Sequence, residues 1–485
     1  MTISEDTFFL NSTFEGTLQQ QIQSLVAEGI LSGRFRPGEK LPSSRRLAKH
    51  LGISRITVTL AYTELLADDY VYAKGRSGYY VSETAPQPRM KSGKTKSVES
   101  VDWGRLIGTR FTQAPQLEKP EDWQRYRYPF IYGQADPSLF DHANWRLCAL
   151  QALGLRNFDA MTSDYYERDD PKLVEFIARH SLPRRGILAN PDEILVTLGA
   201  QNALWLAAEV LLNQKRTAVI ERPCYPGLTG ILSLTRCHLH PIDVDEGGLD
   251  PAAIPTEADV VFATPSHHCP TNVTMPLDRR RALLARAKRD DFLVVEDDYE
   301  FEMSFLTPPS PALKSLDEDG RVIHIGSFSK SLFPGLRLGY MVGSQAFIRE
   351  ARALRATVLR HPPGHVQRTA ATFMSLGHYD ALIKRTANAF KVRRRVMASA
   401  ITKHGLEVAG GGKGGSSFWM RAAEGVDTRD LAMRLRDDSV LIESGVPFFA
   451  GQSDPSNRYF RLAYSSISED RIDDGIAKIA AAMNA

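Results

Sequence analysis

The strongest constraint on the fold is a series of short, continuously apolar runs that alternate with helical stretches. These runs occupy residues 193–197, 217–220, 259–263, 292–295 and 322–325. Strands that are apolar on both faces are typical of a mainly parallel sheet that is covered by helices on both sides. We therefore predict an α/β fold for residues 128–485, with a smaller helix-and-strand lobe after about residue 364.

A polar segment separates this region from the N-terminus. Residues 85–100 are rich in Pro, Lys, Ser and Gly and contain almost no apolar side chain, so they cannot bury enough surface to fold. We predict three parts: a small domain at residues 14–83, a linker at 84–127 and the α/β domain at 128–485. The whole net charge of +3 falls within residues 1–100, which permits the small domain to bind an anionic partner.

Cysteine usage and hydropathy exclude several classes of protein. The four cysteines are widely spaced and form no CxxC pair, so we predict neither a disulfide framework nor a zinc site. No apolar run approaches the roughly 20 residues that are needed to span a bilayer. The N-terminus is acidic, whereas a secretory signal begins with basic residues. We expect a cytoplasmic protein without a membrane partner.

The small domain has the pattern of a helix-turn-helix. Apolar residues at three- and four-residue spacing predict an amphipathic helix over residues 17–33. Ser43 can cap a short second helix, and Gly52 makes the turn that follows it. Ser54 can cap a third helix, which runs to about residue 68. The last helix of such a motif places its first residues in the major groove of DNA. Here those residues are Ser54, Arg55, Thr57 and Thr59.

The segment after the third helix predicts a β-hairpin wing. Two β-rich runs within residues 70–82 flank a tip in which Lys74 and Arg76 lie on either side of Gly75. The run from residue 34 to residue 71 resembles the GntR family of bacterial winged helix-turn-helix regulators. By that resemblance, the DNA-contacting positions are Arg45, Arg55, Thr57, Thr59 and Gly75. Small helical domains with a glycine turn also serve as protein-docking modules, so docking is the alternative.

A lysine that follows a buried strand predicts a covalent cofactor site. Within residues 325–340, Lys330 lies in a loop among Ser and Gly, where its amine can be held against a carbonyl ligand as a Schiff base. Ser327, Ser329 and Arg337 supply two hydroxyl groups and one cation, a set that suits a phosphate ester. Pyridoxal 5'-phosphate (PLP) carries both chemical groups.

Three consecutive acids support the same cofactor. Glu296, Asp297 and Asp298 end an apolar strand, where a solvated acidic turn fits badly. PLP acts as an electron sink only while its pyridine nitrogen is protonated, which requires a fixed carboxylate beside that nitrogen. We assign this role to Asp297. Tyr299 lies two residues further on, on the same side of an extended chain, and can hydrogen-bond the phenolate oxygen of the ring.

Together these segments resemble the fold-type I PLP-dependent aminotransferases over residues 129–485. The resemblance implies that Gly199, Ala200 and Gln201 form the phosphate-binding turn at a helix N-terminus. It also implies that Tyr225 stacks on the PLP ring and that Arg461 binds the α-carboxylate of an amino-acid ligand.

One loop departs from the pattern of these aminotransferases. Residues 263–275 resemble the PSHQxPTGxxM motif, but His268 stands where Gln is usual and Asn272 stands where Gly is usual. We expect His267 near the cofactor, and the two departures put other ligand contacts from this loop in doubt. A metal role for the paired histidines is not predicted, because no nearby carboxylate or thiol set completes a site.

A GntR-type domain joined to an aminotransferase-like domain resembles the MocR subfamily, also called the GabR type. Residues 7–35 and the helix at 55–66 are most similar to regulators of taurine utilisation, with ectoine-utilisation regulators next. The resemblance implies a homodimer that binds double-stranded DNA and a small amine or amino-acid effector. The amine displaces Lys330 from PLP to form an external aldimine, and this switches the DNA-bound conformation. We expect an activator of genes for uptake and catabolism of taurine or a related amino compound.

Two other functions fit the same residues. The first is a working PLP-dependent aminotransferase with an appended DNA-binding domain, because Lys330, Asp297 and Arg461 are all present. The second is a sensor of PLP itself that controls vitamin B6 synthesis and needs no amine. Turnover of an amino donor would identify the enzyme, and DNA affinity that responds to PLP alone would identify the vitamer sensor.

Overall fold

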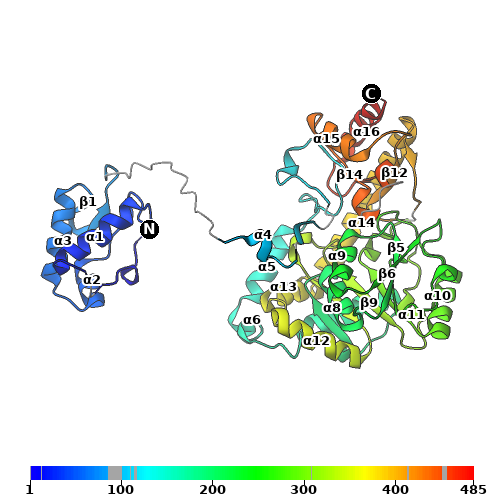
Figure 1. The fold of residues 1–485 in the computed structure, drawn as a ribbon, viewed down its shortest axis with the longest axis horizontal. Coiled ribbons are helices and arrows are strands. Elements are labelled where there is room, and N and C mark those ends of the chain that lie inside the picture. Colours follow the sequence, from blue (N-terminus) through cyan, green and yellow to red (C-terminus); the bar gives the residue numbers. More distant parts are fainter. Residues whose placement is uncertain are drawn as a thin grey trace. The chain divides into compact units, whose positions relative to one another are not determined.

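The chain folds into two compact units, Met1–Arg110 and Phe111–Ala485. The computed structural model describes residues 2–11, 14–85, 101–109, 111–113, 117–306, 308–411, 414–449 and 456–484. Parts of the predicted linker, residues 86–100, 110 and 114–116, lie outside this range. Each unit has its own core, and Figure 1 shows the helices and strands of each. Among the described residues, no helix combines the length and apolar character needed to cross a membrane.

The N-terminal unit is a winged helix-turn-helix. Its elements are α1 (Leu18–Leu31), α2 (Ser44–Leu51), α3 (Arg55–Ala67), β1 (Val71–Ala73) and β2 (Tyr79–Val81). The predicted caps are present: the Ser43 and Ser54 hydroxyls accept hydrogen bonds from the backbone of Arg46 and Ile56. Gly52 ends α2 with φ 67°, a left-handed conformation that favours glycine. The helix-turn-helix and its hairpin therefore lie where the sequence predicts them.

Residues 2–8 also belong to this unit, although the predicted boundary lies at residue 14. The backbone N–H of Ile3 donates to the Lys40 carbonyl at 2.8 Å, and the carbonyl of Phe8 lies 3.2 Å from Nε2 of His50. Ile3 and Phe8 are buried in the same core as the three helices. The segment has no helical or strand periodicity, so its packing could not be predicted from the sequence.

The C-terminal unit is built around a seven-stranded sheet of order β4-β10-β9-β8-β7-β5-β6. Its strands are β4 (Ile194–Thr197), β5 (Thr217–Arg222), β6 (His238–Asp243), β7 (Val260–Ala263), β8 (Leu293–Asp298), β9 (Val322–Ser327) and β10 (Gly339–Val342). Strands β5 to β9 are parallel, and β10 is antiparallel to both β4 and β9. This mostly parallel sheet confirms the predicted α/β class, and five of its strands coincide with the predicted apolar runs.

Helices cover both faces of the sheet because alternate strand residues point to opposite sides. Leu195, Ile220, Phe262, Val295 and Ile325 pack against α8 (Ala200–Leu211), α9 (Pro226–Thr235) and α12 (Gln345–Leu359). Their neighbours on the other face pack against α10 (Leu277–Asp290) and α11 (Leu313–Leu316), or against α7 (Pro171–Phe176) and α13 (Gly364–Ser375). Burial of both faces explains the continuous apolar runs in the sequence.

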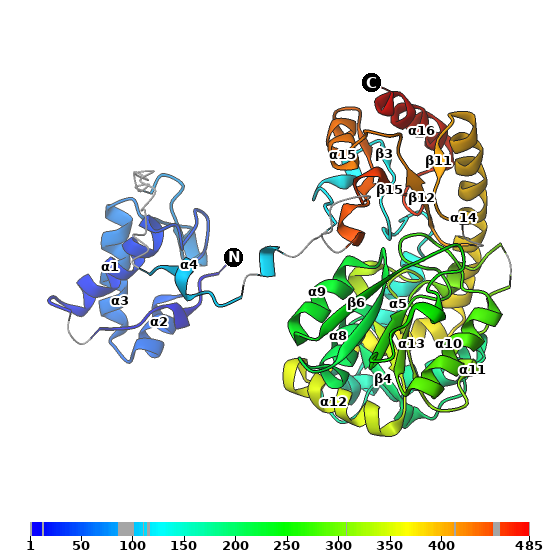
Figure 2. The same ribbon diagram turned by 45° about the vertical axis from the view of Figure 1, so that its right-hand side comes forward.

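A smaller lobe follows the long helix α14 (His378–Lys403). Its antiparallel sheet has the order β11-β12-β15-β14. The strands are β11 (Glu407–Val408), β12 (Ser417–Arg421), β14 (Glu443–Ser444) and β15 (Tyr459–Ala463). Apolar residues of α14, α15 (Thr428–Asp437) and α16 (Glu469–Met483) form one core with this sheet. In both ribbon views the lobe lies at the opposite end of the unit from α12 (Figure 2).

The packing of the N-terminal segment predicts an asymmetry between two adjacent phenylalanines. Phe8→Ala should lower the free energy of unfolding of the N-terminal unit by about 3 kcal/mol, because the ring of Phe8 is 1% exposed and its removal leaves a cavity. Phe9→Ala is the matched control, because Phe9 is 70% exposed. Urea denaturation of residues 1–110 measures both effects. Equal stability losses for the two variants would contradict this packing.

Candidate cofactor site and nucleic-acid interface

Ten of the predicted cofactor and effector residues meet at one cavity of about 310 Å³. These residues are Ala200, Gln201, Tyr225, Asp297, Tyr299, Ser327, Ser329, Lys330, Arg337 and Arg461. The cavity lies where β8 and β9 end and where α8 and α9 begin. Ligands of open α/β sheets bind at the carboxyl ends of parallel strands, because loops and helix N-termini converge there.

Lys330 follows β9 by three residues and is half-buried. Burial lowers the pKa of its amine to about 8, and the carboxylate of Glu300 partly opposes that shift. Nζ lies 4.1 Å from the centroid of the Tyr132 ring. A Cβ added at Gly133 would lie 2.1 Å from Nζ and would displace the amine, and the φ of 70° at this position also favours glycine. An amine with a lowered pKa is partly neutral near pH 7, which suits attack on a carbonyl.

The three consecutive acids at the end of β8 have separate environments. Glu296 lies 3.0 Å from Nδ1 of His324, and Asp298 accepts from Nε of Arg185 at 2.5 Å. Asp297 lines the cavity, and its buried Oδ1 has no hydrogen-bond partner among the described residues. Burial raises the pKa of Asp297 to about 8, and the carboxylates of Asp298 and Glu221 add to that shift. Asp297 is therefore the acid that is free to meet a cationic ring nitrogen.

The opposite wall suits a phosphate group. Gly199 precedes α8 with φ 84°, and no side chain caps this helix. A Cβ at Gly199 would lie 3.2 Å from Nη2 of Arg337, which itself donates to the Leu198 carbonyl at 3.0 Å. Oγ of Ser329 is buried without a partner among the described residues. Uncapped backbone N–H groups, a guanidinium and an unpaired hydroxyl together form an anion site.

Arg461 is held in place at one side of the cavity by three neighbouring side chains. Its Nε donates to Glu443 at 2.8 Å, because the two residues lie directly opposite each other on β14 and β15. Its Cζ lies 4.1 Å from the ring centroid of Tyr132 and 4.8 Å from that of Phe448. Sequence reasoning missed both Glu443 and Tyr132. Neither lies in a motif, and β14 is only two residues long.

The loop that departs from the expected motif contributes mainly structural contacts. His267 does not line the cavity: its Nε2 lies 3.4 Å from Oγ of Ser304, while its carbonyl accepts from Oη of Tyr299 at 3.1 Å. The ring of His268 is buried between Thr271 and Glu221. Asn272 has φ 58°, which explains why glycine is usual there and why Asn is tolerated. No metal-binding cluster occurs within the described part of the chain.

The predicted DNA-contacting residues lie on the winged unit. Arg45, Arg55 and Lys74 are exposed, and within the described residues none of them forms an ion pair. Arg46, in contrast, pairs with Glu5 at 2.5 Å. The unpaired cations are therefore available to phosphate groups.

Several neighbouring positions have specific roles in the winged unit. Thr57 and Thr59 are half-buried on α3, and Ser54 uses its hydroxyl as the helix cap. Gly75 opens the turn between β1 and β2 with φ 50°. The side chain of Arg76 lies outside the described residues. Sequence reasoning missed Ile56, which is 70% exposed beside Arg55 and can meet an apolar base edge.

Two families match different parts of the chain. The bacterial regulatory proteins of the gntR family match residues 18–81, and aminotransferase class I and II matches residues 152–479. The chain is 57% identical to the HTH-type transcriptional regulator TauR of Rhodobacter capsulatus, over 100% of each protein. It is 27% identical to the probable rhizopine catabolism regulatory protein MocR of Rhizobium meliloti, over 80% of this chain and 78% of that protein.

A solved structure resembles the C-terminal unit. Kynurenine aminotransferase of Pyrococcus horikoshii, solved in complex with PMP, superposes with a TM-score of 0.71 and 25% sequence identity. The match covers 79% of this chain and 98% of that protein. Together with the family matches, it confirms both resemblances that the sequence motifs indicate.

The exposed guanidinium of Arg55 leads to a prediction about DNA affinity. Arg55→Ala should weaken binding to operator DNA by about tenfold at near-physiological salt, because it removes a charge-assisted contact at the start of α3. Arg289→Ala, which removes an exposed charge from the other unit, is the control. Fluorescence anisotropy with labelled DNA measures both variants. If Arg55→Ala binds like the wild type, Arg55 is not at the interface.

Proposed function

This chain belongs to the MocR-type transcription regulators, in which a GntR-family helix-turn-helix is joined to an aminotransferase domain, and from this premise we propose that its C-terminal unit senses a small amine. The observation that carries the proposal is the single cavity that brings Lys330, Asp297 and Arg461 together. In this proposal, the occupied cavity controls how the winged units act at an operator in the cytoplasm.

The residues of the cavity fit PLP, the cofactor of the aminotransferase domain. The cofactor supplies an aldehyde carbon that bonds reversibly to an amine, and Lys330 is the residue placed to hold it. The unpaired Oδ1 of Asp297 gains a partner from a protonated ring nitrogen, which also favours the ionised carboxylate. Tyr225 offers a ring face beside it, and the wall around Gly199 and Arg337 holds the phosphate.

The geometry favours a short ligand with an amine at one end and an acid group at the other. Lys330 Nζ and Arg461 Cζ each lie 4.1 Å from the centre of the Tyr132 ring, so they are no more than about 8 Å apart. The acid group binds the edge of Arg461 that Glu443 leaves open, since Glu443 accepts only from Nε. Taurine and γ-aminobutyrate have this size and charge pattern. We propose taurine or a related amino compound as the effector.

An exposed apolar surface supports a homodimer. Leu147, Leu150 and Leu153 on or beside α5 (His142–Ala152), together with Leu155 and Phe158, are all exposed. Such a surface on a regulator is typical of an interface with a second copy of the chain. In a dimer, two winged units bind two half-sites, and a change in either C-terminal unit alters their spacing on DNA. We propose that the liganded arrangement activates transcription of genes for uptake and catabolism of the effector.

The role of Lys330 predicts that its replacement abolishes the absorption band of the bound cofactor. The wild type with PLP should have a visible absorption band from the bound cofactor, and Lys330→Ala should abolish it. Lys119, the other lysine that lines the cavity, is exposed and donates to Gln134 instead. Lys288→Ala, on an exposed surface, is the control and should keep the band. Absorption spectra after gel filtration measure this. A colourless wild type would contradict the assignment of the cofactor site.

A titration with amines tests the sensing function. Taurine, ectoine derivatives and γ-aminobutyrate are added to the PLP-loaded protein while absorption and operator binding are followed. We expect a saturable spectral change with one of these amines and a parallel change in operator binding. No spectral response to any amine would contradict amine sensing. Formation of the corresponding aldehyde or keto acid in repeated turnovers would instead identify an aminotransferase, and operator binding that depends on PLP alone would identify a vitamer sensor.

A further inference from the structure

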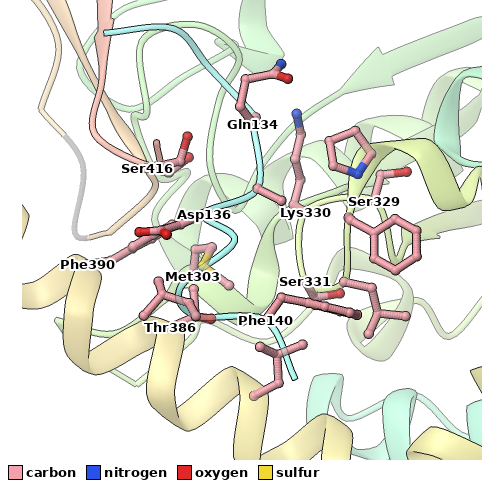
Figure 3. Close-up of a pocket in the computed structure, with 18 of the residues that line it drawn as sticks. Gln134, Asp136, Phe140, Met303, Ser329, Lys330, Ser331, Thr386, Phe390 and Ser416 are labelled. Atoms are coloured by element: carbon pink, nitrogen blue, oxygen red, sulfur yellow. The ribbon is translucent and has the colours of Figure 1, made fainter. Parts of the chain in front are cut away.

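Lys330 also lines a second, smaller cavity of about 40 Å³. Its polar lining includes Gln134, Asp136, Glu300, Ser416 and Ser465. Figure 3 shows Lys330 extending toward Gln134, with Asp136 and Ser416 across the space. A cavity of this size exceeds the roughly 10–15 Å³ that one water molecule occupies on the same scale, so an amino group fits. The lysine can therefore reach two cavities from one backbone position.

Glu300 is the exceptional residue of this second cavity. It is 2% exposed, and its Oε1 accepts from Oγ of Ser416 at 2.5 Å. Its Oε2 is buried and has no hydrogen-bond partner within the described residues. Oγ of Ser465 is also buried without a partner in that part of the chain. A buried carboxylate oxygen without a donor is costly, so this position favours the arrival of a cationic donor.

The other acids near this cavity are already satisfied or neutral. Asp136 forms an ion pair with Arg393. Glu302 accepts from Oη of Tyr379 at 2.8 Å, and burial raises its pKa to about 8, so it is mostly protonated at pH 7. Glu300 is thus the carboxylate beside Lys330 that is free to act as a counter-ion.

Exchange of amines at the cofactor creates a new buried cation. The carbon–nitrogen bond to the cofactor passes from Nζ of Lys330 to the nitrogen of the ligand. A ligand that enters as an ammonium carries three protons on nitrogen and gives two of them to Nζ, which already holds one. Lys330 therefore leaves as an ammonium, and the total charge is unchanged. Burial disfavours that ammonium, so it needs a nearby anion.

We propose that the small cavity receives the displaced amino group of Lys330 and that Glu300 is a positioning residue that holds it there as an ammonium. This inference rests on the amine-sensing function proposed above. The Oε1 side of Glu300 is bound to Ser416, which directly precedes β12 of the smaller lobe. An ammonium held at Glu300 therefore acts on the hydrogen bond between Glu300 and Ser416. This bond joins the smaller lobe to the loop after β8.

Other charged groups also act on the Lys330 amine. They are Arg461, Cys269, Glu443 and Asp297. Arg461 opposes the ammonium, and its ion pair with Glu443 balances only part of that charge. The thiol of Cys269 is neutral near pH 7, because burial raises its pKa to about 11. Removal of the Glu300 carboxylate should therefore lower the pKa of the Lys330 amine more than removal of any other of these groups.

The decisive variant is Glu300→Gln, which keeps the size and a hydrogen bond to Ser416 but removes the charge. It should bind PLP like the wild type and bind the effector amine about tenfold more weakly, the effect of one unit in the pKa of the displaced lysine. This loss of affinity should shrink as the pH rises above the pKa of the displaced lysine, because the bound lysine is then neutral and no longer needs the carboxylate. Glu300→Asp should restore part of the affinity. Glu302→Gln is the matched control and should change neither property.

Amine titrations of the PLP-loaded full chain, followed by absorption at several pH values, measure these effects. If Glu300→Gln has the affinity and pH profile of the wild type, the inference is wrong, whereas a wild type that responds to no amine contradicts the proposed function itself. A direct measurement covers the case in which the variant does not fold. In the liganded wild type, ¹⁵N NMR of labelled lysine should detect an ammonium at Lys330, and a neutral amine would overturn the proposal.

Discussion

Parallel pairing of β8 with β9 is the constraint on which the cofactor site depends. The register places Asp297 opposite Ile325 and Asp298 opposite Gly326, so both strands end at the same edge of the sheet. Lys330 follows three residues after β9 and must therefore emerge close to the acids of β8. Continuous apolar strands make this register possible, because helices bury both faces and the ends alone remain open for polar chemistry.

Buried partners of two neighbouring acids determine which acid is available. Buried acids are costly unless they have partners: Asp298 pairs with Arg185, and Glu296 accepts from the backbone N–H groups of Leu313 and Lys314 and lies 3.0 Å from Nδ1 of His324. The middle acid, Asp297, has no such partner and faces the cavity instead. These partners therefore do more than stabilise the strand end. They leave Asp297 as the acid of the three that lines the cavity, where we propose that it meets a cationic ring nitrogen.

Sequence patterns predicted the parts of this molecule that depend on local chemistry. The caps at Ser43 and Ser54, the apolar strands and the groups around Lys330 all follow from neighbours in the chain. Residues whose roles depend on distant contacts could not be predicted. Glu443 reaches Arg461 only through the pairing of β14 with β15, and Glu300 acquires its role from Ser416, 116 positions later. The packing of Phe8 against the winged unit is of the same kind.

The Tyr132 ring has a consequence for how a ligand is recognised as a whole. A cation at Lys330 and a cation at Arg461 both lie 4.1 Å from the centre of this ring, so they are close enough for like-charge repulsion to raise the energy of each. An acid group that neutralises Arg461 therefore makes an ammonium at Lys330 easier to form. The two ends of one small molecule then reinforce each other, and this coupling is reciprocal. An amine without an acid group loses more than one contact: it also loses this internal cooperativity.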